Sequence, residues 1–365
     1  MKKTLLSLVA LLSCSVAFLS GCGQDKTSPQ SVQAEPAKTY QWKLVTSWPK
    51  NFPGLGLGPE KFAQYVNEMS AGRLTIKVYG AGELVPGFEV FDTVSQGTAQ
   101  MGHSGAYYWK GKMPAAPIFS AIPFGMTATE FNAWLHYGGG LELWQELYKP
   151  FGVVPMAGGN SGAQFAGWFK KEINSIDDLK GLKMRIPGLG GEVLKRAGAI
   201  PVTLTGGEIF SSLQSGAIDA SEWVGPYNDL AFGFYQAADY YYSSVWHETG
   251  TNLEFIINEK ALRALPNDLQ KIIEVAAKAV NEDMLDEYNA RNNQALQTLV
   301  NTHGVQLKKF PKDVLVALKG YTDEVLKEQA EADENFAKIW QSYSAFLQSM
   351  RDYHDLTLKA YFEHR

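Results

Sequence analysis

The sequence predicts an α/β protein built as two lobes, with a sheet in each lobe and a helical region toward its carboxyl end. Segments with strand-like alternation are followed by segments with helix-like spacing, an order that indicates parallel sheets. About 340 residues follow residue 21, more than one hydrophobic core normally serves. Long stretches with helix-like spacing after Pro266 predict the helical region.

Strands and helices alternate through the first two thirds of the chain. Residues 42–46 partly alternate between apolar and polar side chains, as a half-buried strand does. A stretch rich in Gly and Pro then leads to a helix that begins near Glu60. The sequence further predicts a strand at 74–79, a helix at 88–99, a strand or loop at 101–108, a strand at 184–186, helices at 191–197 and 209–214, and a strand entered through 217–220.

The carboxyl-terminal region is predicted to be helical, with one helix over 268–300 and another over 314–339. A tail over 333–361 adds an apolar stripe whose members are three or four residues apart: Phe336, Ile339, Tyr343, Phe346, Met350 and Tyr353. Such a stripe packs either on its own chain or on a partner subunit. The spacing alone leaves both alternatives open.

The first 21 residues have the pattern of an export signal. Two lysines precede an apolar run at 5–18, which is shorter than the roughly 20 apolar residues of a membrane-spanning helix. The sequence LSGC at 19–22 resembles the lipobox of bacterial lipoproteins, which implies a lipid on Cys22; ordinary cleavage with a free Cys22 is the alternative. Residues 22–39 are polar with two prolines, which predicts a flexible tether.

Composition and absent motifs argue against several function classes. The net charge of −5 disfavours a nucleic-acid surface. The other cysteine, Cys14, lies in the export signal, so the exported chain has no pair for an internal disulfide. No HExxH, CxxC, GxSxG or GxxxxGK[ST] motif is present, and no nucleophile is paired with a base, which disfavours an enzyme. The glycine-rich run at 54–58 lacks GxGxxG spacing and is interpreted as a pliable loop at the rim of a cleft.

Three segments, at 159–169, 179–187 and 213–223, concentrate residues suited to binding a ligand. Within the second, Arg185 lies between apolar residues in a strand that should be largely buried, and a buried Arg needs an anionic partner. Its guanidinium fork fits a ligand carboxylate in two-point geometry. A structural salt bridge with Glu222 or another acid is the alternative, and spacing does not separate the two.

The run LKGLKMRIP at 179–187, followed by LTGGEIFSSLQSGAIDASEW at 204–223, resembles the substrate-binding subunits of TRAP (tripartite ATP-independent periplasmic) transporters. The similarity extends from QWKLVTSW at 41–48 to the long helix after Pro266. It implies a periplasmic-binding-protein-like fold of two α/β lobes around a cleft, with a long connecting helix, and it implies that Arg185 pairs with the substrate carboxylate. The implied divisions are lobe I at 40–161 with 250–289, lobe II at 162–249 with 290–332, and a C-terminal dimerisation helix at 333–365.

Glu222-Trp223 stands where many members of that family have Glu-Asn. Together with Gln164 and AGWF at 166–169, this variant is similar to a subgroup that binds 2-oxo or 2-hydroxy monocarboxylates, with a cation between protein and ligand. The resemblance implies that the Gln164 side-chain oxygen, the Glu222 carboxylate and the Trp223 carbonyl ligate the cation. Oxygen ligands suit Na⁺ or Ca²⁺, and a single carboxylate slightly favours Na⁺.

Other polar and aromatic side chains are expected near the cleft. The expected substrate contacts are Arg185, Asn160, Gln164, Tyr107, Trp223 and Glu248, and further cleft candidates are Tyr108, His103 and Trp48. For Asn160, Tyr107, Tyr108, His103, Trp48 and Glu248, a place in the core, at the rim or on the surface is the alternative. His247 is interpreted as a polar cleft or core residue and not as a catalytic base.

The leading hypothesis is a periplasmic or otherwise extracytoplasmic, lipid-anchored binding protein that closes by hinge motion on a small acid such as pyruvate or lactate. The resemblance implies that it delivers this ligand to small and large TRAP membrane subunits. It also implies a homodimer that exchanges the C-terminal helix. The alternatives are a receptor for a dicarboxylate or sugar acid, a sensory binding protein, and an extracytoplasmic lyase or hydrolase.

Overall fold

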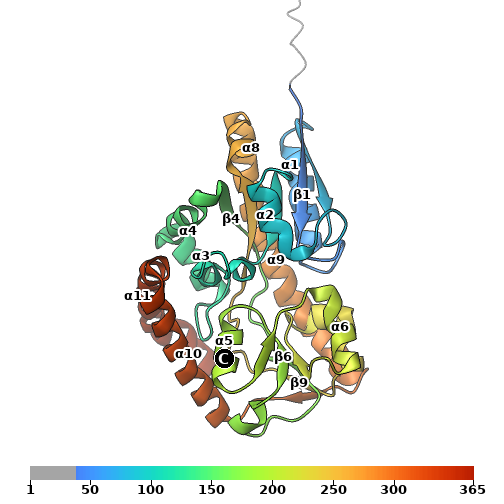
Figure 1. Cartoon of the computed structure of the whole chain (residues 1–365), viewed down its shortest axis with the longest axis vertical. Helices are drawn as coiled ribbons and strands as arrows, with labels where there is room; N and C mark the ends of the chain where they lie inside the picture. The colour runs from blue at the N-terminus through green and yellow to red at the C-terminus, as the bar shows by residue number, and fades with distance from the viewer. Residues whose placement is uncertain (1–37) are drawn as a thin grey trace, which may run out of the picture. The chain divides into compact units, whose positions relative to one another are not determined.

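The computed structural model describes residues 38–365, and Thr39–Arg365 forms one compact unit with two sheets (Figure 1). The first sheet has the strand order β2-β1-β3-β10-β4, with β1 (Tyr40–Thr46), β2 (Leu74–Tyr79), β3 (Met101–Ser104), β4 (Val153–Asn160) and β10 (Asn252–Asn258). The second has the order β11-β9-β5-β8-β6-β7, with β5 (Gly167–Phe169), β6 (Lys183–Arg185), β7 (Ile200–Val202), β8 (Ala220–Ser221), β9 (Tyr240–Tyr242) and β11 (Gln306–Lys308). The predicted α/β class with two sheets is confirmed.

Helices connect and cover these strands. The α-helices are α1 (Leu57–Met69), α2 (Val90–Ser95), α3 (Ala128–Tyr137), α4 (Gly140–Tyr148), α5 (Gly188–Arg196), α6 (Gly206–Ser215), α7 (Pro226–Phe232), α8 (Glu259–Arg263), α9 (Asn267–Asn301), α10 (Lys312–Ala332), α11 (Glu334–His354) and α12 (Ala360–His364). Short 3-10 turns are η1 (Gly87–Glu89), η2 (Ala106–Trp109), η3 (Ala116–Phe119), η4 (Lys149–Phe151), η5 (Ile176–Leu179) and η6 (Phe234–Gln236), and η7 (Asp355–Lys359) is a π-helical turn. Within the described part of the chain, none of these helices has the length and apolar character needed to cross a membrane.

Both sheets are mixed, so the prediction of purely parallel sheets is wrong for one strand in each. β10 runs antiparallel to β3 and β4, and β5 runs antiparallel to β8 and β9. The other pairings are parallel, including β1 with β2 and β6 with β8. The pattern of apolar side chains predicts where strands lie but not their direction. The direction depends on the edge of the sheet at which the connecting chain enters it.

Several predicted elements are present with shifted ends. The helix expected from Glu60 begins at Leu57, and the helix expected over 88–99 is the 3-10 turn η1 followed by α2, which ends at Ser95. Gly97 follows with a φ of 77°, a left-handed conformation that glycine adopts without strain, and this turn ends the helical run. The predicted helix over 268–300 is confirmed as α9.

Helix α9 connects the two sheets, as Figure 1 shows. Its first half buries Ile273 and Val280 in the core that also contains Phe62 of α1 and Phe255 of β10. Its second half contributes Met284, Tyr288 and Leu299 to a second core, which includes Trp168 and Tyr241 of the other sheet. One helix therefore supplies side chains to the packing of both sheets.

The predicted helix over 314–339 is wrong as a single element. Helix α10 ends at Ala332, and Asp333 adopts an extended conformation with φ −141° and ψ 121°. The Asp333 Oδ1 accepts a hydrogen bond of 2.7 Å from the backbone N–H of Phe336 and so caps the start of α11. The capping side chain stops the first helix and begins the next, although the apolar spacing continues across it.

The apolar stripe of α11 packs on its own chain for much of its length. Phe336, Ile339 and Tyr343 are buried, and Tyr343 Oη accepts a 2.7 Å hydrogen bond from the backbone N–H of Met126. Figure 1 shows α11 beside α10, α3 and α4. The last part of the chain, beyond the buried part of this stripe, exposes a group of large hydrophobic side chains: Tyr353, Leu356, Leu358, Tyr361 and Phe362.

The predicted export signal and Cys22 lie outside the residues that the structure describes, as does nearly all of the predicted tether.

Candidate functional site

Loops at strand ends from both sheets meet around a small cavity. In the first sheet these loops follow the carboxyl ends of β1, β3 and β4, with Leu253 of β10 beside them, and in the second the loop follows β8. The cavity has a volume of about 10 Å³, room for about one water molecule. Its lining comes from both sheets: Trp48, Leu55, Tyr107, Ser161, Gln164, Trp223, Val224 and Leu253. This placement, at the carboxyl ends of strands and between two sheets, is where α/β proteins bind ligands.

Arg185 is the fixed positive charge of the site. It is the last residue of β6 and is 1% exposed, and its Nη1 forms an ion pair with Glu222 Oε1. The guanidinium also donates from Nε to the Leu204 carbonyl at 3.2 Å and from Nη2 to Tyr108 Oη at 3.3 Å. Burial works to lower the pKa of Arg185, but Glu222 and the nearby phenols raise it overall, so the guanidinium stays charged. One hydrogen of Nη2 remains for a further acceptor.

Glu222, His247 and Glu248 form a compact buried group beside Arg185. One ligand atom from each lies within 4.8 Å of those of the other two. His247 Nε2 is 3.5 Å from Glu222 Oε2, while the other Glu222 oxygen pairs with Arg185. Burial raises the pKa of Glu248, and the charge of Glu222 raises it further. Two buried carboxyl groups thus lie near one guanidinium, and Arg185 forms its ion pair with Glu222, an arrangement that favours an added cation.

The amide of Gln164 is oriented by two hydroxyl groups. Its Nε2 donates to Ser161 Oγ at 2.8 Å and to Thr251 Oγ1 at 3.1 Å. Thr251 Oγ1 in turn donates to Glu248 Oε2. Because both amide hydrogens are used, Oε1 is the atom of Gln164 left to accept a ligand, and it is buried without a hydrogen-bond partner.

Trp48 and Trp223 close the site from opposite sheets. Their ring centroids are 6.1 Å apart in an edge-to-face arrangement, and the Arg185 guanidinium lies 5.0 Å from the centre of the Trp223 ring. Trp48 Nε1 donates to His103 Nδ1 at 2.7 Å, and His103 Nε2 donates to the Gly158 carbonyl at 2.9 Å. Burial lowers the pKa of His103 to about 4, so this imidazole is neutral and orients Trp48.

Unsatisfied buried polar atoms concentrate in this site. Among the residues from 38 onward, eight buried side-chain nitrogen or oxygen atoms make no hydrogen bond, and five of them belong to Gln164, Glu222, Trp223 and His247. Buried polar atoms without partners are rare in proteins, and each needs an explanation. The Gln164 Oε1 and Glu222 Oε2 oxygens are of the type that ligates Na⁺ or Ca²⁺, so the chemistry of the site fits such a cation.

The structure brings most of the predicted site residues together. Arg185, Glu222, Gln164, Trp223 and Glu248 form the contacts above, and Tyr107 lines the cavity. Burial raises the pKa of Tyr107 well above that of a free phenol, so its hydroxyl stays protonated and able to donate.

The amide of Asn160 is already engaged in loop structure. Its Nδ2 donates to the Gly250 carbonyl at 3.3 Å, and its Oδ1 accepts from the Gly162 N–H at 2.9 Å. The salt bridge between Arg185 and Glu222, one of the alternatives left open by the sequence, is formed.

Sequence reasoning did not single out Thr251 or Ser161, and it left His247 as a general cleft or core residue. Thr251 and Ser161 act by orienting Gln164, a role that depends on contacts across the fold. The backbone N–H of Ser161 donates to the Thr251 carbonyl at 3.0 Å, so the two loops that carry them are joined. The closeness of His247 to Glu222, which follows a different strand, has no signal in the local sequence.

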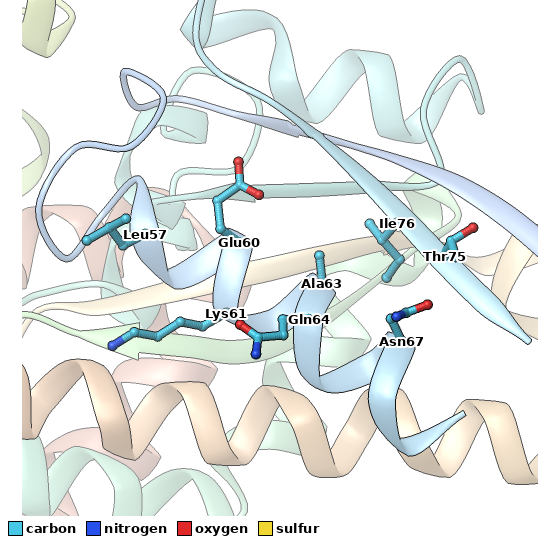
Figure 2. Close-up of a pocket in the computed structure, with 8 residues that line it drawn as sticks. All are labelled: Leu57, Glu60, Lys61, Ala63, Gln64, Asn67, Thr75 and Ile76. Carbon is cyan, nitrogen blue, oxygen red and sulfur yellow. The ribbon is translucent and has the colours of Figure 1, made fainter. Parts of the chain in front are cut away.

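A larger hollow of about 560 Å³ lies elsewhere, over helix α1 and strand β2 (Figure 2). Its lining is mixed, and the charged Lys61 is paired with Asp283 at 2.6 Å and with Glu287 at 3.3 Å. None of the residues predicted for the functional site lines it. Volume alone therefore does not identify the functional site of this protein.

Comparisons with known proteins agree with this site. The sequence model of the bacterial extracellular solute-binding protein family 7 matches residues 44–333. The monocarboxylate 2-oxoacid-binding periplasmic protein of Nostoc sp. (strain PCC 7120) is 42% identical over 345 residues, which cover 94% of this chain and 93% of that protein.

Two solved structures are similar along their whole length. A TRAP periplasmic solute-binding protein from Pseudoalteromonas atlantica T6c, with bound sodium and pyruvate, is 44% identical with a TM-score of 0.88, and the match covers 90% of this chain and 100% of that one. A TRAP periplasmic solute-binding protein from Colwellia psychrerythraea, with bound calcium and pyruvate, is 45% identical with a TM-score of 0.88 and the same coverage.

Proposed function

Because this chain belongs to family 7 of the bacterial extracellular solute-binding proteins, we propose that it captures a small 2-oxo or 2-hydroxy monocarboxylate for a TRAP-type transporter. Pyruvate is the first candidate, since it is bound in both similar structures, and lactate is the second. The observation that carries the proposal is the buried Arg185–Glu222 pair, placed beside buried oxygen atoms that have no hydrogen-bond partner. The protein then acts as a receptor that releases its ligand unchanged.

Arg185 supplies the attraction for the acid. Its remaining Nη2 hydrogen, together with the protonated hydroxyls of Tyr107 and Tyr108, offers donors to a carboxylate. The Trp223 ring beside the guanidinium keeps water away and so strengthens this attraction. Gln164, Trp223, Glu248 and Asn160 complete the proposed contacts, since the Asn160 Nδ2 keeps a second hydrogen beside the one that it donates to the Gly250 carbonyl.

A cation is proposed to offset the negative charge that accumulates in the site. Glu222 and the ligand carboxylate together exceed the single charge of Arg185, and Glu248 adds to the imbalance when it is ionised. The Gln164 Oε1, the Glu222 carboxylate and the Trp223 carbonyl are the proposed protein ligands, and Na⁺ or Ca²⁺ suits this oxygen set. Both ions are found with pyruvate in similar structures, one in each.

Binding requires the site to open and close. The cavity of about 10 Å³ has room for about one water molecule, and the proposed opening moves the surrounding side chains apart to admit an organic acid. The proposed moving parts are two lobes, at 40–161 with 250–289 and at 162–249 with 290–332, each with one of the two sheets. A hinge between them is a common solution in binding proteins.

The proposed partners are the small and large membrane subunits of a TRAP transporter, with the protein held at the membrane by a lipid on Cys22. The LSGC sequence at 19–22 supports this anchor. Changing Cys22 to Ala is expected to move the protein from the membrane fraction to the soluble fraction after cell breakage. An unchanged distribution between the two fractions would contradict the proposed lipid anchor but would not bear on the proposed binding function.

A homodimer through the C-terminal segment is also proposed. The exposed residues at its end include Leu356, Tyr361 and Phe362, an apolar group of the kind that marks protein interfaces. The first half of α11 is already buried in its own subunit, so the proposed contact lies beyond Tyr353.

The test of the proposed function is ligand binding by protein that has been refolded from denaturant to remove any bound acid. Thermal unfolding with pyruvate, lactate, dicarboxylates and sugar acids, each with Na⁺, Ca²⁺ or chelator, distinguishes the candidates. Ligand at 100 times its dissociation constant stabilises the fold by about 2.7 kcal/mol. A rise in the unfolding temperature that needs both a monocarboxylate and the cation supports the proposal. A rise only with dicarboxylates or sugar acids would show that the ligand belongs to one of those classes instead. Chemical change of the acid on incubation would contradict a receptor without turnover.

A further inference from the structure

His247 is a buried histidine whose ring nitrogens both lack hydrogen-bond partners among the described residues. It is 2% exposed, and neither Nδ1 nor Nε2 makes a hydrogen bond to any residue that the structure describes. An imidazole always has at least one N–H donor, and leaving such a group unsatisfied costs about 1 to 3 kcal/mol. His103 provides the contrast, because both of its ring nitrogens are bonded, one to Trp48 and one to Gly158.

The surroundings of His247 place it against the binding site. Its Nε2 is 3.5 Å from Glu222 Oε2, an oxygen that also lacks a hydrogen-bond partner. The backbone on the other side is close: a Cβ on Gly190 of helix α5 would lie 3.3 Å from the His247 Cβ and 2.9 Å from Ile186 Cδ1. Because Gly190 has no side chain, helix α5 can pack closely against the Cβ of His247.

We infer that His247 is a ligand-contacting residue, which hydrogen-bonds an oxygen of the bound acid and so helps to set its specificity. This inference rests on the proposed function and adds a residue to it. The two ring nitrogens of His247 and one oxygen each of Glu222 and Gln164 lie in the same site and lack hydrogen-bond partners within the described chain. A bound polar ligand would give these atoms the partners that buried polar groups normally have.

The contact is to the acid and not to the cation. Na⁺ and Ca²⁺ take oxygen ligands, and the site already offers oxygens from Gln164 and Glu222. Imidazole nitrogen suits zinc, copper, iron or nickel instead. A ring N–H of His247 is, by contrast, a good donor to a carboxylate or a 2-oxo oxygen.

The test compares His247→Leu and His247→Gln with the unchanged protein, using calorimetric titration with pyruvate at saturating Na⁺ or Ca²⁺. His247→Leu removes both nitrogens and is expected to weaken binding by about tenfold or more, while His247→Gln keeps an N–H donor and restores most of the affinity. His247→Leu is also expected to leave the ligand-free protein as stable as before, or more stable, because no satisfied hydrogen bond is lost. His103→Leu is the matched control, and it is expected to lower the ligand-free stability.

Three outcomes would overturn the inference. Equal affinity of the Leu variant and the unchanged protein would make His247 a core residue. A fall in ligand-free stability as large as that of His103→Leu, with unchanged affinity, would mean that its nitrogens are satisfied inside the protein. A loss of affinity that disappears when the cation concentration is raised beyond the level that saturates the unchanged protein would make His247 a cation ligand. If the unchanged protein binds no monocarboxylate, the proposed function itself fails, a result distinct from the other three.

Discussion

The ring of Phe52 stacks on the ring of Phe232, with their centroids 4.2 Å apart. Phe52 belongs to the loop between β1 and α1, whereas Phe232 ends α7, after β8 of the other sheet. The Pro53 carbonyl in the same loop accepts a 2.9 Å hydrogen bond from Asn228 Nδ2 of α7. Trp48 and Leu55, on either side of Phe52, line the cavity. The loop therefore joins the two sheets at the same place where it encloses the site.

The first prediction concerns this contact. Phe52→Ala is expected to speed dissociation of the bound acid about 3- to 10-fold, because the aromatic pair stabilises the closed arrangement by about 0.5 to 1.5 kcal/mol. Stopped-flow release of pyruvate measures the rate. Phe62→Ala is the control, since Phe62 and Phe255 form a similar pair, 4.2 Å apart, inside the core of the first sheet. If both variants release the acid at the same rate, the loop does not hold the site closed.

The second prediction concerns Arg185. Arg185→Lys is expected to weaken acid binding about tenfold or more, because an ammonium group cannot reproduce the donors to Glu222, Tyr108 and the acid at once. Lys keeps a positive charge beside Glu222, so the buried carboxylate is not left uncompensated as it would be in Arg185→Ala. Calorimetric titration measures the affinity, and thermal unfolding checks the fold. Affinity equal to that of the unchanged protein would remove Arg185 from the binding site.

The third prediction concerns the cation. Glu222→Gln removes the one carboxylate in the proposed ligand set and is expected to abolish the dependence of acid binding on Na⁺ or Ca²⁺. Glu254→Gln is the matched control, because Glu254 is also buried but its two oxygens accept hydrogen bonds from Trp109 and Tyr148. Titrations with and without chelator measure the dependence. If acid binding by the Glu222→Gln variant still depended on the cation, the proposed set of cation ligands would be wrong.

The fourth prediction concerns pH and Glu254. Burial raises the pKa of Glu254 to about 7, from the ordinary glutamate value of 4.5, although hydrogen bonds from Trp109 and Tyr148 work in the other direction. The folded protein therefore binds a proton that the unfolded chain has released between pH 4.5 and 7. Its contribution to the free energy of unfolding is largest below pH 4.5 and is lost as the pH rises through 7, a fall on the order of 1 to 3 kcal/mol.

Urea unfolding of the unchanged protein and of Glu254→Gln, at pH 5 and at pH 8, tests this direction. From pH 5 to pH 8, the free energy of unfolding of the unchanged protein should fall relative to that of the Glu254→Gln variant. A difference that is the same at both pH values would show that Glu254 has the same pKa in the folded and unfolded chains.

The fifth prediction concerns assembly. Removal of residues 355–365 is expected to convert a dimer to a monomer, because this segment holds most of the exposed apolar side chains at the end of the chain. Phe336, Ile339 and Tyr343 remain buried in the shortened chain, so its melting temperature should change little. Light scattering after size-exclusion chromatography measures the mass. A monomeric full-length protein would rule out the proposed dimer.

The sequence predicted that Arg185, Gln164 and Glu222 lie at one site, and the structure places them close together. The buried position of Arg185 followed from its apolar neighbours in a strand, whereas Gln164 and Glu222 were expected there because their motifs resemble those of a known family; their roles toward a ligand and a cation stay predictions. The reversed direction of β10 and β5 was not predictable, since the same side-chain pattern serves either direction. Asp333 was also overlooked, because the apolar spacing continues across it while its side chain ends one helix and caps the next.

His247 illustrates what a linear pattern cannot contain. Its role depends on which hydrogen-bond partners are missing, and partners are known only when the whole fold surrounds the residue. His103 is equally polar and equally buried, yet its two bonds make it a support for Trp48. Nothing in the sequence distinguishes these two histidines.

Helix α9 has a consequence for folding. Ile273 and Val280 are part of one core and Met284, Tyr288 and Leu299 are part of the other, so neither core is complete unless this single helix is formed along its length. Melting of the first half of α9 then removes side chains from the first of these cores, and melting of the second half removes them from the other. The chain from Thr39 to Arg365 should accordingly lose its structure in one cooperative transition, and a fragment that contains only one of the sheets should not fold by itself.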